Sequence, residues 1–161
     1  MNVKFKGNQV TLEGNIVKVG DVAPNFVVID NGLNPVESKD FKGKRAYLSV
    51  PSIDTSVCDL EVRKFNTEAS KLKDAKIYTI SMDLPFAQAR WCGNAGIEAV
   101  QTLSDYKDRS FGKEFGTYIK ELGLLTRAVF VVDENNKVTY VEYCEEVTSE
   151  PNYEAVLNAL K

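Results

Sequence analysis

The most reactive side chains of this sequence are its three cysteines, at positions 58, 92 and 144, and no histidine accompanies them. The absence of histidine excludes the Ser-His-Asp triad, the Cys-His dyad and every histidine-ligated metal site. The cysteines form no CxxC pair, which disfavours a zinc ribbon and a thioredoxin-type dithiol. Their odd number argues against a secreted disulfide framework, and in a reducing cytosol a disulfide is usually transient and catalytic. Any chemistry must therefore use Cys, Asp, Glu, Lys, Arg, Tyr or backbone groups, and we expect no metal and no cofactor. At this point all three cysteines can also be small buried hydrophobic residues.

Cys58 stands where a thiolate would be stabilised. The apolar spacing over residues 58–72 predicts a helix with Cys58 in its first turn, facing the core. The first N–H groups of a helix have no intrahelical acceptors and carry a partial positive charge, which favours a negative sulfur. The apolar stripe of this helix consists of Cys58, Val62, Phe65, Ala69 and Leu72. Its charged side chains fall elsewhere on the helix, at Asp59, Glu61, Arg63, Lys64, Glu68 and Lys71.

The segment before Cys58 connects a predicted strand to this helix. Pro51 ends the strand at residues 46–50, and ligands of open α/β sheets bind at such strand-to-helix loops. Asp54, Thr55 or Ser56 can cap the helix, and a threonine hydroxyl three residues before Cys58 can also reach its sulfur. From these residues alone, Cys58 can equally be a packed core residue with Thr55 acting only as a cap.

The remaining elements predict how this loop is held. Residues 3–12 alternate apolar and polar side chains on either side of Gly7 and Asn8, which predicts an N-terminal β-hairpin. Residues 21–44 are loop-rich, with a short strand at 26–29. Further strands are predicted at 46–50, 76–82, 99–103, 128–132 and 138–143, and helices at 58–72, 86–92, 109–115 and 153–160. A βαβ start, a late hairpin across residues 134–136 and a closing helix predict an α/β, thioredoxin-like mixed central sheet flanked by helices. The late hairpin favours this fold over a flavodoxin-like one.

Composition sets the class of protein. The chain has 161 residues, of which 43% are apolar and 27% charged, and we expect one soluble domain over residues 1–161. The net charge of −3 and the lack of a basic patch argue against nucleic acid and membrane partners. The N-terminus lacks the apolar segment of a signal peptide, and no apolar run approaches the roughly 20 residues of a membrane span. These features predict a cytoplasmic protein.

The sequence around Cys58 resembles a known family. Pro51, Thr55 and Cys58 match the peroxiredoxin pattern P-x-x-x-T-x-x-C. Three segments are similar to the thiol peroxidase subgroup of that family. They are Ser-Ile-Asp at the variable positions 52–54 of the pattern, VRKFN at 62–66 and RAVFVVD at 127–133. The segment RWCG at 90–93 resembles the part of the subgroup that carries the resolving cysteine, and the N-terminal hairpin also fits. The resemblance covers essentially the whole chain.

The resemblance implies a role for each of these residues. Cys58 is then the peroxidatic thiolate, which attacks a peroxide oxygen and becomes a sulfenic acid. Thr55 hydrogen-bonds the thiolate and the peroxide, Arg127 supplies fixed positive charge, and Pro51 shields the sulfenic acid from water. Cys92 is the resolving thiol that forms an intramolecular disulfide with Cys58, and thioredoxin reduces this disulfide.

The resemblance also implies substrates and partners. These are hydrogen peroxide and alkyl hydroperoxides, thioredoxin as reductant, and a second copy of the chain in a homodimer, in a role of antioxidant defence. Because Cys58 and Cys92 are both predicted on helices, and a disulfide needs Cα atoms closer than about 7 Å, we expect a helix end to unwind on oxidation. Gly93 and Gly96 make the Cys92 end easy to melt. Trp91 departs from the family pattern, and Cys144, which has no family role, is expected to be structural.

Three other functions are compatible with parts of this pattern. A one-cysteine peroxidase would leave Cys92 inert, and a Cys92→Ser variant distinguishes it. A redox sensor would keep the fold and dock on a partner in its oxidised form, but the complete set of Pro51, Thr55, Cys58 and Arg127 favours catalysis. A thioredoxin-like reductase is disfavoured, because residue 61 is Glu where its second cysteine would stand.

Overall fold

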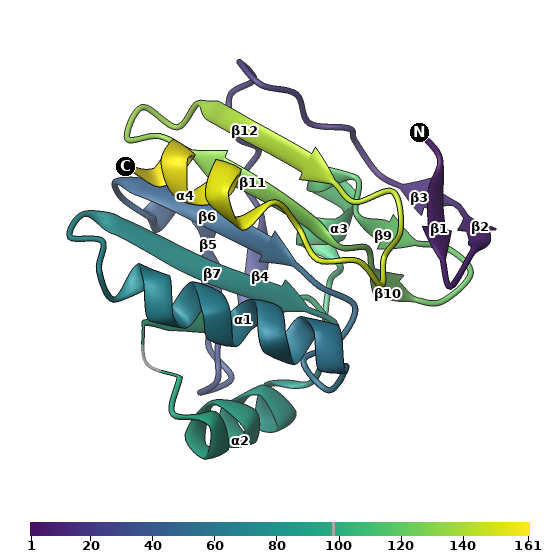
Figure 1. Cartoon of the computed structure of the whole chain (residues 1–161), viewed down its shortest axis with the longest axis horizontal. Coiled ribbons are helices and arrows are strands. Elements are labelled where there is room, and N and C mark those ends of the chain that lie inside the picture. The colour runs from purple at the N-terminus through teal and green to yellow at the C-terminus, as the bar shows by residue number, and fades with distance from the viewer. Residues whose placement is uncertain (98) are drawn as a thin grey trace.

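The computed structural model describes residues 1–97 and 99–161, and its central feature is a seven-stranded mixed sheet of order β12-β11-β6-β7-β8-β4-β5 (Figure 1). Its middle strands are parallel, namely β6 (Lys44–Ser49), β7 (Ala75–Ser81) and β8 (Val100–Ser104). The outer strands pair antiparallel with their neighbours, namely β4 (Val27–Ile29), β5 (Pro35–Glu37), β11 (Ala128–Val132) and β12 (Val138–Tyr143). The mixed sheet and the late hairpin are therefore confirmed.

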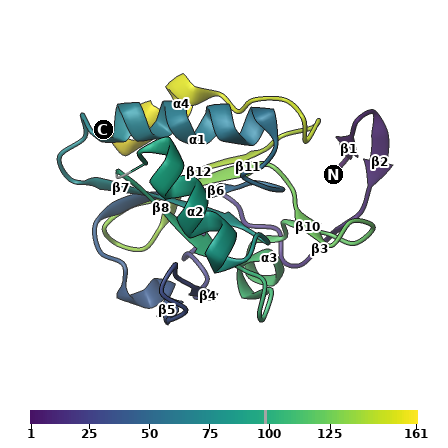
Figure 2. The ribbon, with the colours of Figure 1, turned by 90° about the horizontal axis from the view of Figure 1, so that it is seen from below.

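Helices pack on both faces of this sheet. Three of them share an aliphatic core on one face, namely α1 (Ser56–Ala69), α2 (Pro85–Ala95) and α4 (Tyr153–Leu160). The helix α3 (Ser110–Phe115) packs with an aromatic core on the other face. Figure 2 shows α1 and α4 together on one side of the sheet and α3 on the other. Side chains alternate along β11, so Val129 and Val131 enter the first core and Phe130 the second.

Two small sheets and a short 3-10 helix complete the fold. The β-hairpin of β1 (Val3–Phe5) and β2 (Asn8–Val10) turns at Lys6 and Gly7, both with positive φ. A three-stranded sheet joins β3 (Leu12–Glu13), β9 (Tyr118–Ile119) and β10 (Leu124–Leu125), and the 3-10 helix covers Ser38–Asp40. The N-terminal hairpin is confirmed. Leu12 was expected in its second strand, which is wrong, because β2 ends at Val10 and Leu12 pairs with Ile119 instead.

Several predicted boundaries need correction. The helix expected at residues 58–72 begins earlier, because Thr55 caps it, and ends at Ala69. Beyond that point the amides of Lys71 and Leu72 donate three residues back, which tightens the last turn. The second helix extends on both sides of the predicted 86–92. The two- and three-residue strands β5, β9 and β10 were not predicted, because they are too short to show a pattern. No helix among the described residues is long and apolar enough to cross a membrane.

Candidate active site

Cys58 lies in the first turn of α1, at the carboxyl end of the sheet's central parallel strands. The Thr55 Oγ1 atom accepts a hydrogen bond of 3.1 Å from the Cys58 amide, which defines the start of the helix. The same hydroxyl donates to the Ser52 carbonyl at 3.3 Å. Both bonds of the Thr55 hydroxyl within the described part of the chain are thus to backbone groups. Thr55 stands beside Cys58 as predicted, but here it acts as a helix cap.

The Arg127 guanidinium contacts the Cys58 sulfur directly. Its Nη2 atom lies 2.9 Å from Cys58 Sγ, and only 1% of the Arg127 residue is exposed. The other nitrogens are held in place, because Nε donates to the Val147 carbonyl at 2.7 Å and Nη1 to Glu61 Oε1 at 2.9 Å. An arginine anchored at two points delivers its third donor to the sulfur with little freedom, and it keeps its charge at all relevant pH values.

Glu61 is a site residue that the sequence reading missed. We expected it away from the core face of the helix, which is wrong, since the residue is fully buried beside Arg127. Burial raises the pKa of Glu61 to about 7, although the attraction of Arg127 opposes this shift. Burial also acts to lower the pKa of Arg127, but the attraction of Glu61 and Cys58 raises it overall. The signal in the sequence was the three-residue spacing from Cys58, which puts both side chains on one side of α1.

Asp83 anchors the loop that carries Cys58. Its carboxylate accepts hydrogen bonds from the Ser52 hydroxyl at 2.7 Å and from the Ile53 amide at 2.9 Å. The Ser81 hydroxyl donates to the same carboxylate at 2.7 Å and accepts from the Gln88 amide group on α2. This network joins the active-site loop, the end of β7 and α2. It was not predicted, because its partners lie about 30 residues apart in the chain.

A hollow of about 340 Å³ opens beside Arg127 and the Cys58 loop. It is lined by Phe5, Lys6, Pro51, Thr55, Ser56, Val57, Arg127, Val147 and Thr148. Pro51 is buried in its wall, and Phe5 comes from the N-terminal hairpin. The Glu146 carboxylate holds the hairpin turn there by accepting from the Gly7 amide at 2.7 Å and the Lys6 amide at 3.3 Å. The hollow therefore combines an apolar wall with the fixed charge of Arg127.

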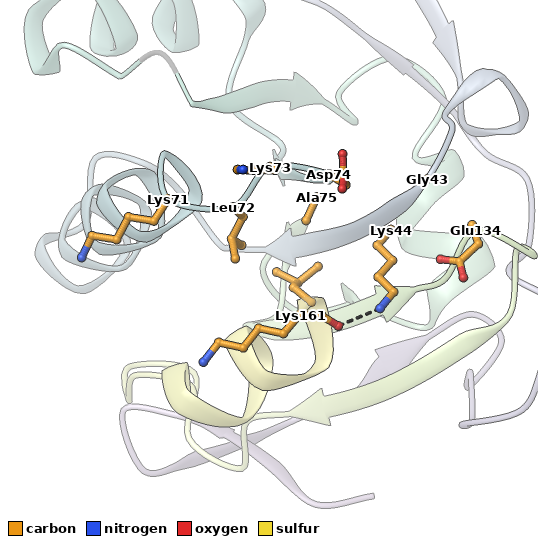
Figure 3. Close-up of a pocket in the computed structure, with 10 residues that line it drawn as sticks. Gly43, Lys44, Lys71, Leu72, Lys73, Asp74, Ala75, Glu134 and Lys161 are labelled. Atoms are coloured by element: carbon orange, nitrogen blue, oxygen red, sulfur yellow. Dashed lines mark hydrogen bonds between the residues drawn. The ribbon is translucent and has the colours of Figure 1, made fainter.

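A second hollow, of about 460 Å³, lies at the other ends of β6 and β7 (Figure 3). Its lining includes several lysines, and the Lys44 ammonium donates to the Lys161 carbonyl at 2.7 Å. None of the predicted site residues lines it, and neither does a cysteine. Three of the predicted site residues, Pro51, Thr55 and Arg127, line the hollow beside the Cys58 loop instead.

Cys92 and Cys144 occupy environments that differ from that of Cys58. All three cysteines are free thiols. Cys92 is half-buried on α2, with its Sγ atom 3.3 Å from Thr102 Oγ1 on β8, and so has a different neighbour from Cys58. Burial, together with the nearby Glu142 carboxylate, raises the pKa of the Cys144 thiol to about 12. Cys144 is thus protonated at neutral pH, whereas Cys58 faces a guanidinium.

Comparisons with known proteins show which family the chain belongs to. Residues 18–157 match the model of the redoxin family, so the chain belongs to that family. It is 63% identical over 159 residues to a thiol peroxidase of Clostridium acetobutylicum, covering 99% of this chain and 97% of the relative. The identity to the thiol peroxidase of Bacillus subtilis is 59%, covering 99% and 96%. Within the redoxins, the chain thus groups with the thiol peroxidases of the peroxiredoxins.

The comparison with solved structures also points to the peroxiredoxins. The crystal structure of a peroxiredoxin-like protein from Aquifex aeolicus superposes with a TM-score of 0.93 at 39% identity, covering 99% of this chain and 95% of that one. The thioredoxin-like fold predicted from the order of strands and helices is therefore confirmed.

Proposed function

We propose that this protein reduces hydroperoxides with Cys58 as the nucleophile, Arg127 and Thr55 as the groups around it, and Cys92 as the resolving thiol. The observation that carries the proposal is the 2.9 Å contact between Arg127 Nη2 and Cys58 Sγ at the capped start of α1. A fixed positive charge and a helix N-terminus both favour the thiolate, which is the reactive form. The thiol peroxidase relatives support the same activity.

The first half of the reaction oxidises Cys58. The thiolate attacks the terminal peroxide oxygen, the O–O bond breaks, and Cys58 becomes a sulfenic acid while the alkoxide leaves and takes up a proton. Arg127 stabilises the charge as it moves from sulfur to the leaving oxygen, because its guanidinium is fixed by Glu61 and Val147. Pro51, in the wall of the hollow, limits the access of water.

The second half restores the thiol. Cys92 attacks the Cys58 sulfenic acid, a disulfide forms, and one water molecule leaves. Thioredoxin then supplies two electrons and two protons by thiol–disulfide exchange. Because Cys58 and Cys92 lie on two different helices and the Cys92 sulfur contacts Thr102, we expect α2 or the start of α1 to unwind locally in this step.

A homodimer completes the proposal. Leu84 and Phe86 are large apolar residues that are about half exposed or more, and together with Ala87 and Arg90 they line a shallow hollow at the start of α2. Exposed apolar groups that share one surface favour an interface between copies. This surface begins just after Asp83, which anchors the Cys58 loop.

The experiment is a single turnover followed by mass spectrometry. Reduced wild-type protein, Cys58→Ser and Cys92→Ser are each mixed with one equivalent of cumene hydroperoxide, quenched with a thiol alkylating agent, and analysed intact and as peptides. We expect a Cys58–Cys92 disulfide in the wild type, a persistent Cys58 sulfenic acid in Cys92→Ser, and no oxidation in Cys58→Ser. A Cys92→Ser variant that still turns over with thioredoxin at the wild-type rate would make the protein a one-cysteine peroxidase.

A further inference from the structure

Residues directly beside the two reacting cysteines are joined to each other across helices α1 and α2. The Trp91 Nε1 atom donates a hydrogen bond of 2.7 Å to Asp59 Oδ1. Asp59 follows Cys58 in the chain and Trp91 precedes Cys92. Among the described residues, this is the only side-chain hydrogen bond between α1 and α2. We define the pair Asp59 and Trp91 as the interhelix clasp.

A third residue supports the clasp. The Arg63 Nε atom lies 2.9 Å from Asp59 Oδ2, which leaves Oδ1 free to accept from Trp91. The same guanidinium lies over the Trp91 ring, 5.8 Å from its centroid. The Asp59 side chain is only 35% exposed, so the hydrogen bond to its charge is partly shielded from water.

The turn of α2 that carries Cys92 has two side-chain contacts, the clasp to α1 and the 3.3 Å contact between Cys92 Sγ and Thr102 Oγ1 on β8. Gln88 fixes the first half of the helix, because its amide group donates to Ser81 Oγ and to the Leu103 carbonyl. The first turn has no side-chain cap, and the helix ends on Gly96 in the left-handed conformation. The turn that carries Cys92 is thus held to α1 by the clasp and to β8 by Thr102, while the helix end that follows it is easy to open.

We propose that Asp59 and Trp91 are positioning residues for the resolving step, and that release of their hydrogen bond limits how fast Cys92 reaches the oxidised Cys58. The inference rests on the proposed Cys58–Cys92 disulfide. The clasp keeps α1 and α2 folded while Cys58 reacts with peroxide beside Arg127. Once the sulfenic acid has formed, the clasp holds Cys92 back.

The delay has a chemical consequence. A second hydroperoxide molecule competes with Cys92 for the sulfenic acid, transfers one oxygen to it to give a sulfinic acid, and is itself reduced to the alcohol. The clasp therefore sets the fraction of Cys58 that is lost to sulfinic acid at high peroxide concentration. A weaker clasp shifts the competition toward the disulfide.

The test compares Trp91→Phe with the wild type in rapid-quench experiments. Phenylalanine keeps an aromatic ring but has no N–H donor, and the charge beside Cys58 is unchanged. We expect the disulfide to form about threefold to tenfold faster in Trp91→Phe, as fits the loss of one partly exposed hydrogen bond to a charged group. The rate of Cys58 oxidation stays the same, and the sulfinic fraction under excess cumene hydroperoxide falls.

Variants at the acceptor distinguish the clasp from general loosening. Asp59→Ala and Asp59→Asn remove the same charge beside Cys58, but asparagine keeps an oxygen for Trp91. We expect faster resolution in Asp59→Ala than in Asp59→Asn, and no further gain in the double variant Asp59→Ala/Trp91→Phe. Glu68→Ala is the matched control, because it removes an ion pair between α1 and Lys71, just beyond the end of the helix, and this pair does not involve α2.

The outcomes separate the two proposals. An unchanged or slower disulfide rate in Trp91→Phe overturns the clasp while the peroxidase function stands. A wild type that forms no Cys58–Cys92 disulfide removes the resolving role and the clasp together. In the wild type, Trp91 is the sole tryptophan, so its fluorescence must change in the phase in which the disulfide forms.

Discussion

At the scale of single residues, Arg127 links the Cys58 sulfur to Glu61 and to the Val147 carbonyl. Its guanidinium donates one hydrogen bond to each of these three partners, from Nε to Val147, from Nη1 to Glu61 and from Nη2 to Cys58. Two of these contacts fix the position of the guanidinium, and the third reaches the Cys58 sulfur. A lysine in this place has one compact charged group and cannot make all three contacts in the same arrangement.

The Arg127→Lys variant therefore tests the geometry and not merely the charge. We expect the second-order rate constant of Cys58 oxidation to fall roughly a hundredfold, as when a preorganised donor is removed from a site of developing charge. Stopped-flow mixing with cumene hydroperoxide measures this constant. Arg45→Lys is the control, since Arg45 is equally buried but bonds to Tyr47, Gly43 and Asn136. A similar loss in both variants would contradict a specific role of Arg127.

Glu61 predicts a pH dependence of stability. Its pKa is about 7 in the folded protein against an ordinary 4.5, so the folded state holds the proton more tightly than the unfolded state. The stabilisation by this proton is fully present below about pH 4.5 and is lost as the pH rises to about 7. We therefore expect the free energy of unfolding in urea to fall for the wild type, relative to Glu61→Gln, as the pH rises from about 4.5 to about 7. Asp105, with a pKa raised to about 6 by burial, follows the same trend in both proteins and cancels. A difference that is constant with pH would contradict the raised pKa.

At the scale of elements, the N-terminal hairpin forms one wall of the active-site hollow. Phe5 brings its ring to the hollow, and Glu146 ties the hairpin turn to the segment that also supplies the Val147 carbonyl to Arg127. The hairpin is thus joined to Arg127 through two consecutive residues, Glu146 and Val147. Its apolar contribution bears on the organic part of the substrate rather than on the O–O bond.

Phe5→Ala should therefore change substrate preference. Removing the ring takes apolar contact away from a bulky hydroperoxide, and we expect kcat/KM for cumene hydroperoxide to fall about tenfold. The value for hydrogen peroxide, which has no apolar part, should hardly change. Leu122→Ala, at an exposed apolar position outside this hollow, serves as control. Equal losses for both peroxides would show that the hairpin matters for stability alone.

Several residues of these elements show what could be predicted from the sequence and what could not. Thr55 and Cys58 were placed correctly at the helix start, because capping and apolar spacing are local signals. Glu61 was misplaced, because its three-residue spacing from Cys58 does not by itself reveal Arg127, the partner 66 residues later that accompanies it in the core. The network around Asp83 was missed for the same reason. Leu12 was assigned to the wrong strand, since alternation does not show where one strand turns into the next.

At the scale of the whole molecule, most of the fold followed from the order of its strands and helices, and the rest depended on long-range contacts. The surface used for assembly could not be predicted from the sequence either, because the residues that share an apolar surface are known only once the chain is folded. Leu84 and Phe86 share such a surface at the start of α2. If the chain forms the proposed homodimer through this surface, Phe86→Glu should sediment as a monomer, whereas Val19→Glu, at a similarly exposed position, should sediment as the wild type does. A wild type that sediments as a monomer would contradict the proposed homodimer.

The central claim is that Cys58 is the nucleophile of a thioredoxin-dependent peroxidase. Its most direct test is the consumption of NADPH in the presence of thioredoxin, thioredoxin reductase and cumene hydroperoxide, with wild type beside Cys58→Ser and Cys144→Ser. We expect rapid loss of NADPH with the wild type and with Cys144→Ser, and none above background with Cys58→Ser. Undiminished turnover in Cys58→Ser, or none in the wild type, would contradict this account.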